Sequence, residues 1–147
     1  MPAKDYYAES KRLRAEAMAN AEKLTNRPLI FKINKGFEMV VEVTKTDIKT
    51  LVSKNTPDNK FNAIKNALLR DIEGYLKKST YVGWRNTDPE KHDETAYFSY
   101  FNRTLGANTY LCLRKMKNTN RYKPYSVESQ WMFDHNKISL KKGNPPL

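Results

Sequence analysis

The chain has 147 residues, of which 39% are hydrophobic and 29% charged, and this balance fits one polar domain that can still bury a compact core. No run approaches the roughly 18 apolar residues that cross a bilayer, and no apolar signal segment opens the sequence, so we expect a soluble, cytoplasmic protein without a transmembrane segment. One cysteine (Cys112) and two histidines (His92 and His135) exclude an intramolecular disulfide framework and a structural zinc site. We expect no metal and no cofactor, although carboxylate-bound magnesium stays open.

The net charge of +11 favours a polyanionic partner, which could be nucleic acid, an anionic membrane or an acidic protein. The charge is concentrated, because residues 103–142 carry nine basic and only two acidic side chains. A basic surface that serves solubility alone is the alternative.

The chain is predicted to begin with a helix and a β-hairpin. Residues 5–24 are rich in Ala, Glu, Lys and Arg but have few apolar positions, which predicts a helical arm (assigned to residues 1–28) that buries little. Residues 29–33 and 37–43 are rich in β-branched and aromatic side chains, and the turn-forming Asn34-Lys35-Gly36 separates them. This pattern is typical of a hairpin.

Two further helices are expected after the hairpin. Thr44 or Thr46 caps a short helix over residues 44–52, and Thr56-Pro57 supplies the cap and first position of a longer one. Apolar side chains of the longer helix fall on one stripe, namely Phe61, Ile64, Leu68, Ile72, Tyr75 and Leu76. The opposite face is polar and carries Asn62, Lys65, Asn66, Glu73 and Lys77. Gly74 weakens this helix without ending it.

The second half of the chain is predicted to form an antiparallel meander. A polar loop, Trp84–Asp93, comes before three strands with two-residue alternation, over residues 95–102, 109–117 and 126–133. The fold class is therefore α+β: an amphipathic helix packed on an antiparallel β-sheet, preceded by an N-terminal helix and a β-hairpin. We assign this single domain to residues 29–140 and a flexible tail to residues 141–147.

Side chains suited to metal-free cleavage of RNA gather on the predicted strands. That chemistry needs a base near the 2′-hydroxyl, cations around the phosphate and an acid at the leaving oxygen. His92, or His135 in its place, is a natural acid or base near neutral pH. Tyr97 follows on the next strand, and Arg114 or Lys115 could flank the phosphate, although these two face opposite sides of their strand. A surface-loop histidine beside ordinary strand aromatics is the alternative interpretation.

Basic and aromatic residues also alternate in a way that is typical of single-stranded RNA binding. In Arg121-Tyr122-Lys123-Pro124-Tyr125, tyrosines could stack on bases while the cations contact phosphates. Some of these tyrosines are expected in the core. The residues predicted to contact nucleic acid are Lys65, Lys115, Lys117, Arg121 and Lys123.

Five segments of the second half of the chain, taken in their order along the sequence, carry a resemblance to a known family. They are Tyr75-Leu76-Lys77-Lys78-Ser79, Asp88-Pro89-Glu90-Lys91-His92, Tyr97-Phe98-Ser99-Tyr100-Phe101, Asn108-Thr109-Tyr110-Leu111-Cys112-Leu113-Arg114 and Tyr125-Ser126-Val127-Glu128-Ser129. With them, the stretch from Thr46 to Asp134 resembles the phage-associated Barnase–EndoU–Colicin E5/D–RelE-like nuclease domains. The resemblance implies helices followed by an antiparallel sheet and metal-independent ribonuclease activity. It would bring His92, Arg114 and a serine of the last strand, Ser126 or Ser129, close to the site.

Three functions are compatible with these observations. The leading hypothesis is a ribonuclease-like effector or toxin domain of phage or bacterial origin that cleaves RNA by 2′-hydroxyl attack, with His92, Arg114, Ser129 and Tyr97 as its catalytic residues. RNA would be its substrate, an acidic immunity or inhibitor protein its partner, and a larger phage polypeptide its context. The second is a non-catalytic nucleic-acid or protein binding module of the same fold in phage assembly. The third is an ADP-ribosyltransferase that uses NAD, although no nicotinamide-binding motif is recognisable.

Overall fold

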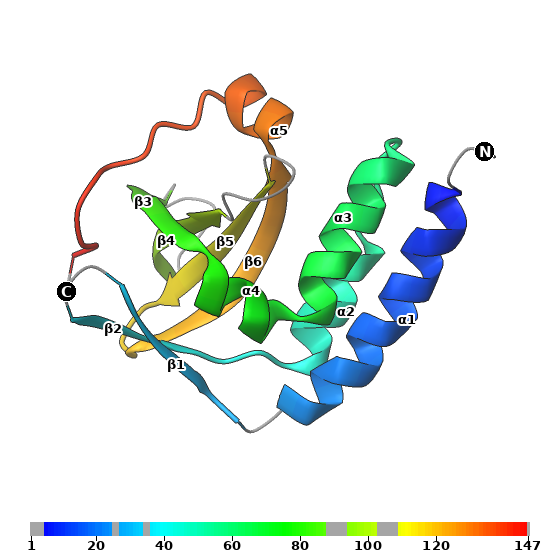
Figure 1. Ribbon diagram of the computed structural model, residues 1–147. Helices are drawn as coiled ribbons and strands as arrows, with labels where there is room; N and C mark the ends of the chain where they lie inside the picture. Colours follow the sequence, from blue (N-terminus) through cyan, green and yellow to red (C-terminus); the bar gives the residue numbers. More distant parts are fainter. Residues whose placement is uncertain (1–4, 25–26, 34–35, 88–93, 103–108, 147) are drawn as a thin grey trace.

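The computed structural model describes residues 5–24, 27–33, 36–87, 94–102 and 109–146 (Figure 1). Within these residues it contains helices packed against one curled, six-stranded sheet, which confirms the α+β fold class. The elements in chain order are α1 Tyr6–Leu24, β1 Leu29–Ile33, β2 Phe37–Val41, α2 Lys45–Ser53, α3 Asn59–Arg70, α4 Ile72–Lys78, β3 Thr80–Asn86, β4 Thr95–Asn102, β5 Thr109–Met116, β6 Arg121–Ser129 and α5 Gln130–His135.

The sheet is mixed rather than purely antiparallel. Its strand order is β1-β2-β6-β5-β4-β3, and neighbours run antiparallel except β2 and β6. These two are parallel, with Val40 opposite Arg121 and Val41 opposite Tyr122. The hairpin and the meander are therefore predicted correctly as units, but the parallel pairing that joins them is not visible in local sequence patterns.

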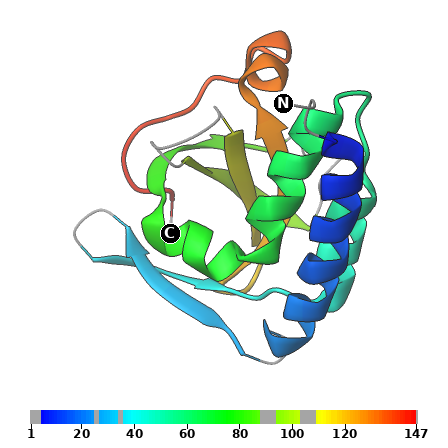
Figure 2. The same ribbon diagram turned by 45° about the vertical axis from the view of Figure 1, so that its right-hand side comes forward.

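The N-terminal helix is part of the domain, so the prediction of a separate arm is wrong. α1 lies along α3 (Figure 2, blue beside green), and Leu13, Ala17 and Ala21 are buried there. The two alanines allow the helix axes to approach closely, which few large apolar side chains would permit. The few large apolar side chains predict an exposed helix, whereas the small alanines form the actual packing surface.

The predicted long helix is divided into α3 and α4 at Asp71, whose backbone leaves the helical region (φ −135°, ψ 62°). Its carboxylate accepts a hydrogen bond from the backbone N–H of Gly74 at 3.1 Å and caps α4. α3 itself is capped by Asp58, two residues after the predicted Thr56. The short helix after the hairpin is confirmed, with Thr44 and Asp47 forming a capping box.

We expect the effect of Gly74→Ala to depend on Asp71. A Cβ at position 74 would lie 2.3 Å from Oδ2 of Asp71, so the cap would have to move away. Losing a cap costs about 1 kcal/mol, which offsets the gain of about 1 kcal/mol that alanine brings to a helix. Gly74→Ala should therefore give no net stabilisation in the native chain but should stabilise an Asp71→Ala chain. Urea denaturation of the four proteins measures this coupling, and equal effects in both backgrounds would contradict it.

The polar face of α3 is also buried, contrary to a simple amphipathic pattern. Asn62, Lys65 and Asn66 are each no more than 3% exposed. Asn66 donates through Nδ2 to both the carbonyl and the hydroxyl of Ser10 on α1, each at 3.0 Å. On this side α3 contacts α1 through Asn66 and the segment before α3 through Asn62 and Lys65, which bond to Thr56 and Lys54.

The meander differs from the prediction at both of its ends. At one end it has a further strand, β3, which the sequence pattern does not predict and which includes Trp84 and Arg85 of the predicted loop. β6 starts at Arg121, and the chain turns into α5 after Ser129, whose hydroxyl accepts a hydrogen bond from the N–H of Met132. Trp131 is consequently 69% exposed and not part of the core. The two-residue alternation continued into α5 by chance.

The segment predicted as a flexible tail is held against β3 at Lys141 and Gly143, and Pro145 is buried. Trp84 and Lys141 exchange two backbone hydrogen bonds, of 3.1 and 2.7 Å. Gly83 has φ +148°, and a Cβ there would lie 2.6 Å from the carbonyl oxygen of Lys141, so only glycine lets the segment come this close. The hydroxyl of Tyr81 donates to the carbonyl of Gly143 at 3.0 Å.

The sheet has two differently packed faces, as the alternation in β4 and β5 predicts. The helix-facing side carries Tyr97, Phe101, Leu111 and Leu113 and packs on the helices. The other side, called the second face below, carries a smaller cluster: Phe98, Tyr100, Cys112 and Phe133, with Val82, Tyr110, Tyr125, Ile138 and Leu140 against it. None of the helices in the described ranges is long and apolar enough to cross a bilayer.

Candidate functional site

The structure does not bring the predicted catalytic residues together. Tyr97 lies on the helix-facing side, 3% exposed, and its hydroxyl is hydrogen-bonded to that of Tyr122. Burial raises the pKa of Tyr97, so its phenol is a core group. Arg114 lies on the second face, in register with Phe98. Tyr97 and Arg114 therefore cannot share a site across the sheet.

Ser129 is distant from Arg114 along β5. It pairs with Thr109, five residues from Arg114, which corresponds to about 16 Å of strand. Its hydroxyl also serves as the cap of α5. Ser126, the alternative serine, is in register with Cys112 on the second face. His92 lies outside the described residues.

Three of the five predicted nucleic-acid contacts line one hollow. Lys117, Arg121 and Lys123 surround a space of about 600 Å³ beside Met116, Asn118 and Thr119, together with Glu42 and Glu94. Two of the cations are paired: Arg121 with Glu42 at 3.2 Å and Lys123 with Asp47 at 3.4 Å. Their positive charge is thus partly neutralised within the protein.

The other two predicted contacts are less available. Lys115 is partly buried and donates to the carbonyls of Met116 and Thr119, and burial lowers its pKa. Lys65 is 3% exposed and donates to the carbonyl of Lys54. It is not a surface contact, because the polar face of α3 packs inside the helical layer.

Lys65 should make stability depend on pH. Burial, with the charges of Lys54 and Arg14 adding to it, lowers the pKa of Lys65 to about 8. An unfolded lysine titrates near 10.4, so between these values the unfolded chain binds more protons, and the free energy of unfolding should rise with pH. Urea denaturation from pH 7.5 to 10 measures this rise, and Lys65→Met should flatten it. An unchanged slope in that variant would contradict the assignment.

The second face holds a different group of functional side chains: Arg85 on β3, Tyr100 on β4 and Glu128 on β6. The Nε of Arg85 donates to the hydroxyl of Tyr100 at 2.7 Å. Tyr100 is fully buried, while Arg85 and Glu128 are partly exposed. Arg114 is partly exposed on the same face. A carboxylate and two guanidinium groups therefore share one side of the sheet.

The charge state of Glu128 is set by competing effects. Burial raises the pKa of its carboxyl group, and Arg85 and the Tyr100 hydroxyl both act in the opposite direction. A carboxyl group with a raised pKa, near a cation, is suited to proton transfer closer to neutral pH. In contrast, burial raises the pKa of Cys112 to about 12, with Glu128 adding to the effect, so its thiol is not a nucleophile at neutral pH.

Aromatic rings extend this group toward the helices. The guanidinium of Arg85 lies 4.5 Å from the centre of the Phe98 ring, and that ring lies 4.6 Å from the ring of Tyr125. The ammonium group of Lys54, at the end of α2, lies 5.9 Å from the Tyr125 ring. These contacts hold Arg85 in place through stacking as well as through its hydrogen bond.

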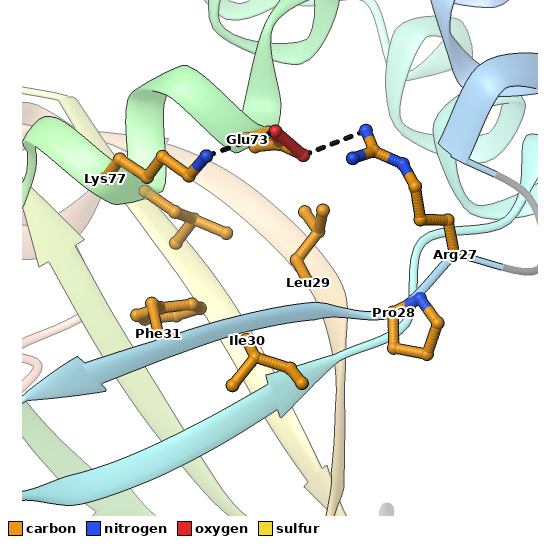
Figure 3. A pocket seen from close by; sticks show the side chains of 8 residues that line it. Arg27, Pro28, Leu29, Ile30, Phe31, Glu73 and Lys77 are labelled. Carbon is orange, nitrogen blue, oxygen red and sulfur yellow. Dashed lines mark hydrogen bonds and ion pairs between the residues drawn. The ribbon is translucent and has the colours of Figure 1, made fainter.

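A further hollow, of about 140 Å³, lies between β1 and α4 (Figure 3). There, Glu73 forms ion pairs with Arg27 at 3.0 Å and with Lys77 at 3.3 Å. The apolar part of the lining includes Leu29 and Phe31. Its charged groups satisfy one another, so it offers no free group for chemistry.

Sequence reasoning missed Arg85 and Glu128. Arg85 falls in the predicted loop, and Glu128 is only one of the alternating polar positions of the last predicted strand. The period-two pattern that places Tyr100 and Tyr97 on opposite faces of the sheet also places Glu128 and Val127 on opposite faces. This signal could have identified Glu128.

Comparisons with protein-family models, curated proteins and solved structures found no match to this chain. Among the described residues, no three His, Cys, Asp or Glu side chains come together in a way that could hold a metal ion.

Proposed function

We propose that this chain is a metal-independent ribonuclease-like domain of phage or bacterial origin, an effector or toxin, which acts on RNA at the second face of its sheet. The observation that carries the proposal is the grouping of Arg85, Tyr100 and Glu128, with Arg114 on the same face. A cytoplasmic site of action and an acidic inhibitor protein as partner belong to the same proposal.

In the proposed reaction, Glu128 accepts the proton of the 2′-hydroxyl as that oxygen attacks the neighbouring phosphorus. The bond from phosphorus to the 5′-oxygen breaks, and the products are a 2′,3′-cyclic phosphate and a 5′-hydroxyl. Arg85 and Arg114 stabilise the negative charge that develops on the phosphate oxygens. His92 remains our candidate for the acid that protonates the leaving oxygen. Tyr97 and Ser129 have no part in it.

The test is RNA degradation by the purified protein in EDTA, compared with Arg85→Met and with Lys78→Met as a matched loss of one exposed charge. Lys78 lies at the end of α4 and is exposed. Cleavage by wild type and Lys78→Met, with strong loss in Arg85→Met, would support the proposal. Intact RNA from pH 5 to 9, with the protein folded, would refute it.

A non-catalytic RNA-binding module is the second candidate, favoured by the hollow that Lys117, Arg121 and Lys123 line. It predicts RNA affinity that falls steeply with salt, because bound cations on RNA are released. Charge reversal at these three positions should weaken binding in a filter-binding titration. RNA binding without cleavage would support the binding-module function over the ribonuclease. Absence of RNA binding at low salt would refute it.

A further inference from the structure

A separate hollow, of about 250 Å³, lies in the helical layer between the first half of α1 and the loop that leads into α3. Lys11 and Arg14 line it from α1, and Asn55, Thr56, Asn59 and Asn62 line it from the other side. No carboxylate is among its lining residues. The hollow is therefore basic and rich in amide and hydroxyl groups.

Its walls are fixed by hydrogen bonds. Asn62 is 3% exposed, its Oδ1 accepts from the backbone N–H of Thr56 and its Nδ2 donates to the carbonyl of Thr56, each at 2.9 Å. On the other side, Nδ2 of Asn66 on α3 donates a hydrogen bond to the backbone carbonyl of Ser10 on α1. Both sides of the hollow are therefore held to α3 by hydrogen bonds within the chain.

The positive charges around the hollow have no counterion within the described residues. Arg14 reaches only the hydroxyl of Ser53, at 3.3 Å, and Lys11 lies over the Tyr7 ring at 4.4 Å. Arg14 is also close enough to act on buried Lys65, whose pKa is lowered by burial and by the charges of Lys54 and Arg14.

Three cations elsewhere on the helical layer differ from Lys11 and Arg14, because each has a carboxylate partner. Arg12 and Arg70 both pair with Glu16, and Lys45 pairs with Glu22. Asp58, next to the lining residue Asn59, uses its carboxylate to cap α3. An anion bound in the hollow would neutralise the charges of Lys11 and Arg14, which have no ion-pair partner among the described residues.

We propose that this hollow binds the phosphate group of a small phosphomonoester. The two negative charges of the phosphate group are complementary to Lys11 and Arg14, which line the hollow. Charge-assisted hydrogen bonds from these two side chains are the strongest contacts available to it there. The amides of Asn55 and Asn59 supply further donors. Tyr7, 56% exposed at the rim, offers a flat ring for the organic part, so a nucleoside monophosphate is the preferred class. This inference does not rest on the proposed ribonuclease activity, because it uses none of the residues of the second face.

Calorimetric titration of the full chain with AMP, inorganic phosphate and adenosine tests the proposal. We compare wild type with Lys11→Met/Arg14→Met, and with Lys78→Met/Lys142→Met as a control that loses two exposed charges elsewhere. AMP should bind more tightly than phosphate, and adenosine should not bind measurably. The first double variant should weaken AMP binding by about tenfold or more, whereas the control should keep it.

A second readout separates a specific site from general attraction to a basic protein. Saturating AMP should raise the pKa of Lys65 above its value of about 8, measured by NMR of its side chain, in wild type and in the control. Equal AMP affinity in all three folded proteins would overturn the proposal. No AMP binding by wild type at millimolar concentration, or an unmoved Lys65, would overturn it as well.

Discussion

Replacing Glu128 with Gln should lower the rate of RNA cleavage by about 10²–10⁴-fold, because the amide cannot accept the proton of the 2′-hydroxyl. The substitution keeps the size of the side chain beside Tyr100, so the fold should be maintained. In wild type, the rate should rise with pH through the pKa of Glu128, which burial places above that of an ordinary glutamate. The residual activity of Glu128→Gln should lack this rise.

Tyr97→Phe is the control for that experiment. Tyr97 lies on the helix-facing side, so the variant should lose stability through the Tyr122 contact while its cleavage rate stays near that of wild type. A Glu128→Gln protein that cleaves within threefold of wild type, about 0.7 kcal/mol in barrier height, would contradict the role of Glu128.

Ile72→Ala should lower the free energy of unfolding by about 2–5 kcal/mol, the range for truncating a large buried aliphatic side chain. Ile72 is 0% exposed at the start of α4, within the cluster between the helices and the sheet. Urea denaturation measures the loss. Ile30→Ala is the matched control, because Ile30 on β1 is 62% exposed and its truncation should change stability by less than about 0.5 kcal/mol. Similar losses in both variants would show that the core is misplaced.

The fold class could be predicted because the hairpin, most of the helices and the strands β4 and β5 carry local patterns. Phe98 and Tyr100 alternate with Tyr97 and Phe101, and this alone assigns them correctly to two faces. The parallel contact of β2 with β6 could not be predicted, because it joins segments about 80 residues apart and depends on packing rather than on propensity.

The candidate site was harder to predict for a related reason. Arg85 lies on β3, and the polar residues that follow this strand make it look like a loop in the sequence. Its position also depends on contacts with Phe98 and Tyr100, which form only in the assembled sheet. Conversely, Lys65 had the sequence context of a surface cation and is buried, with its ammonium group bonded to the carbonyl of Lys54. Charge in a sequence locates neither a buried lysine nor an ion pair between distant segments.

The central claim, cleavage of RNA by its own 2′-hydroxyl without a metal, is tested most directly with an end-labelled oligoribonucleotide in EDTA. A second oligonucleotide carries one 2′-deoxyribose immediately before the preferred cleavage position. We predict cleavage of the first with a 2′,3′-cyclic phosphate on the product, and no cleavage at the modified position of the second. Cleavage at that position, or a product with a 5′-phosphate, would contradict the account.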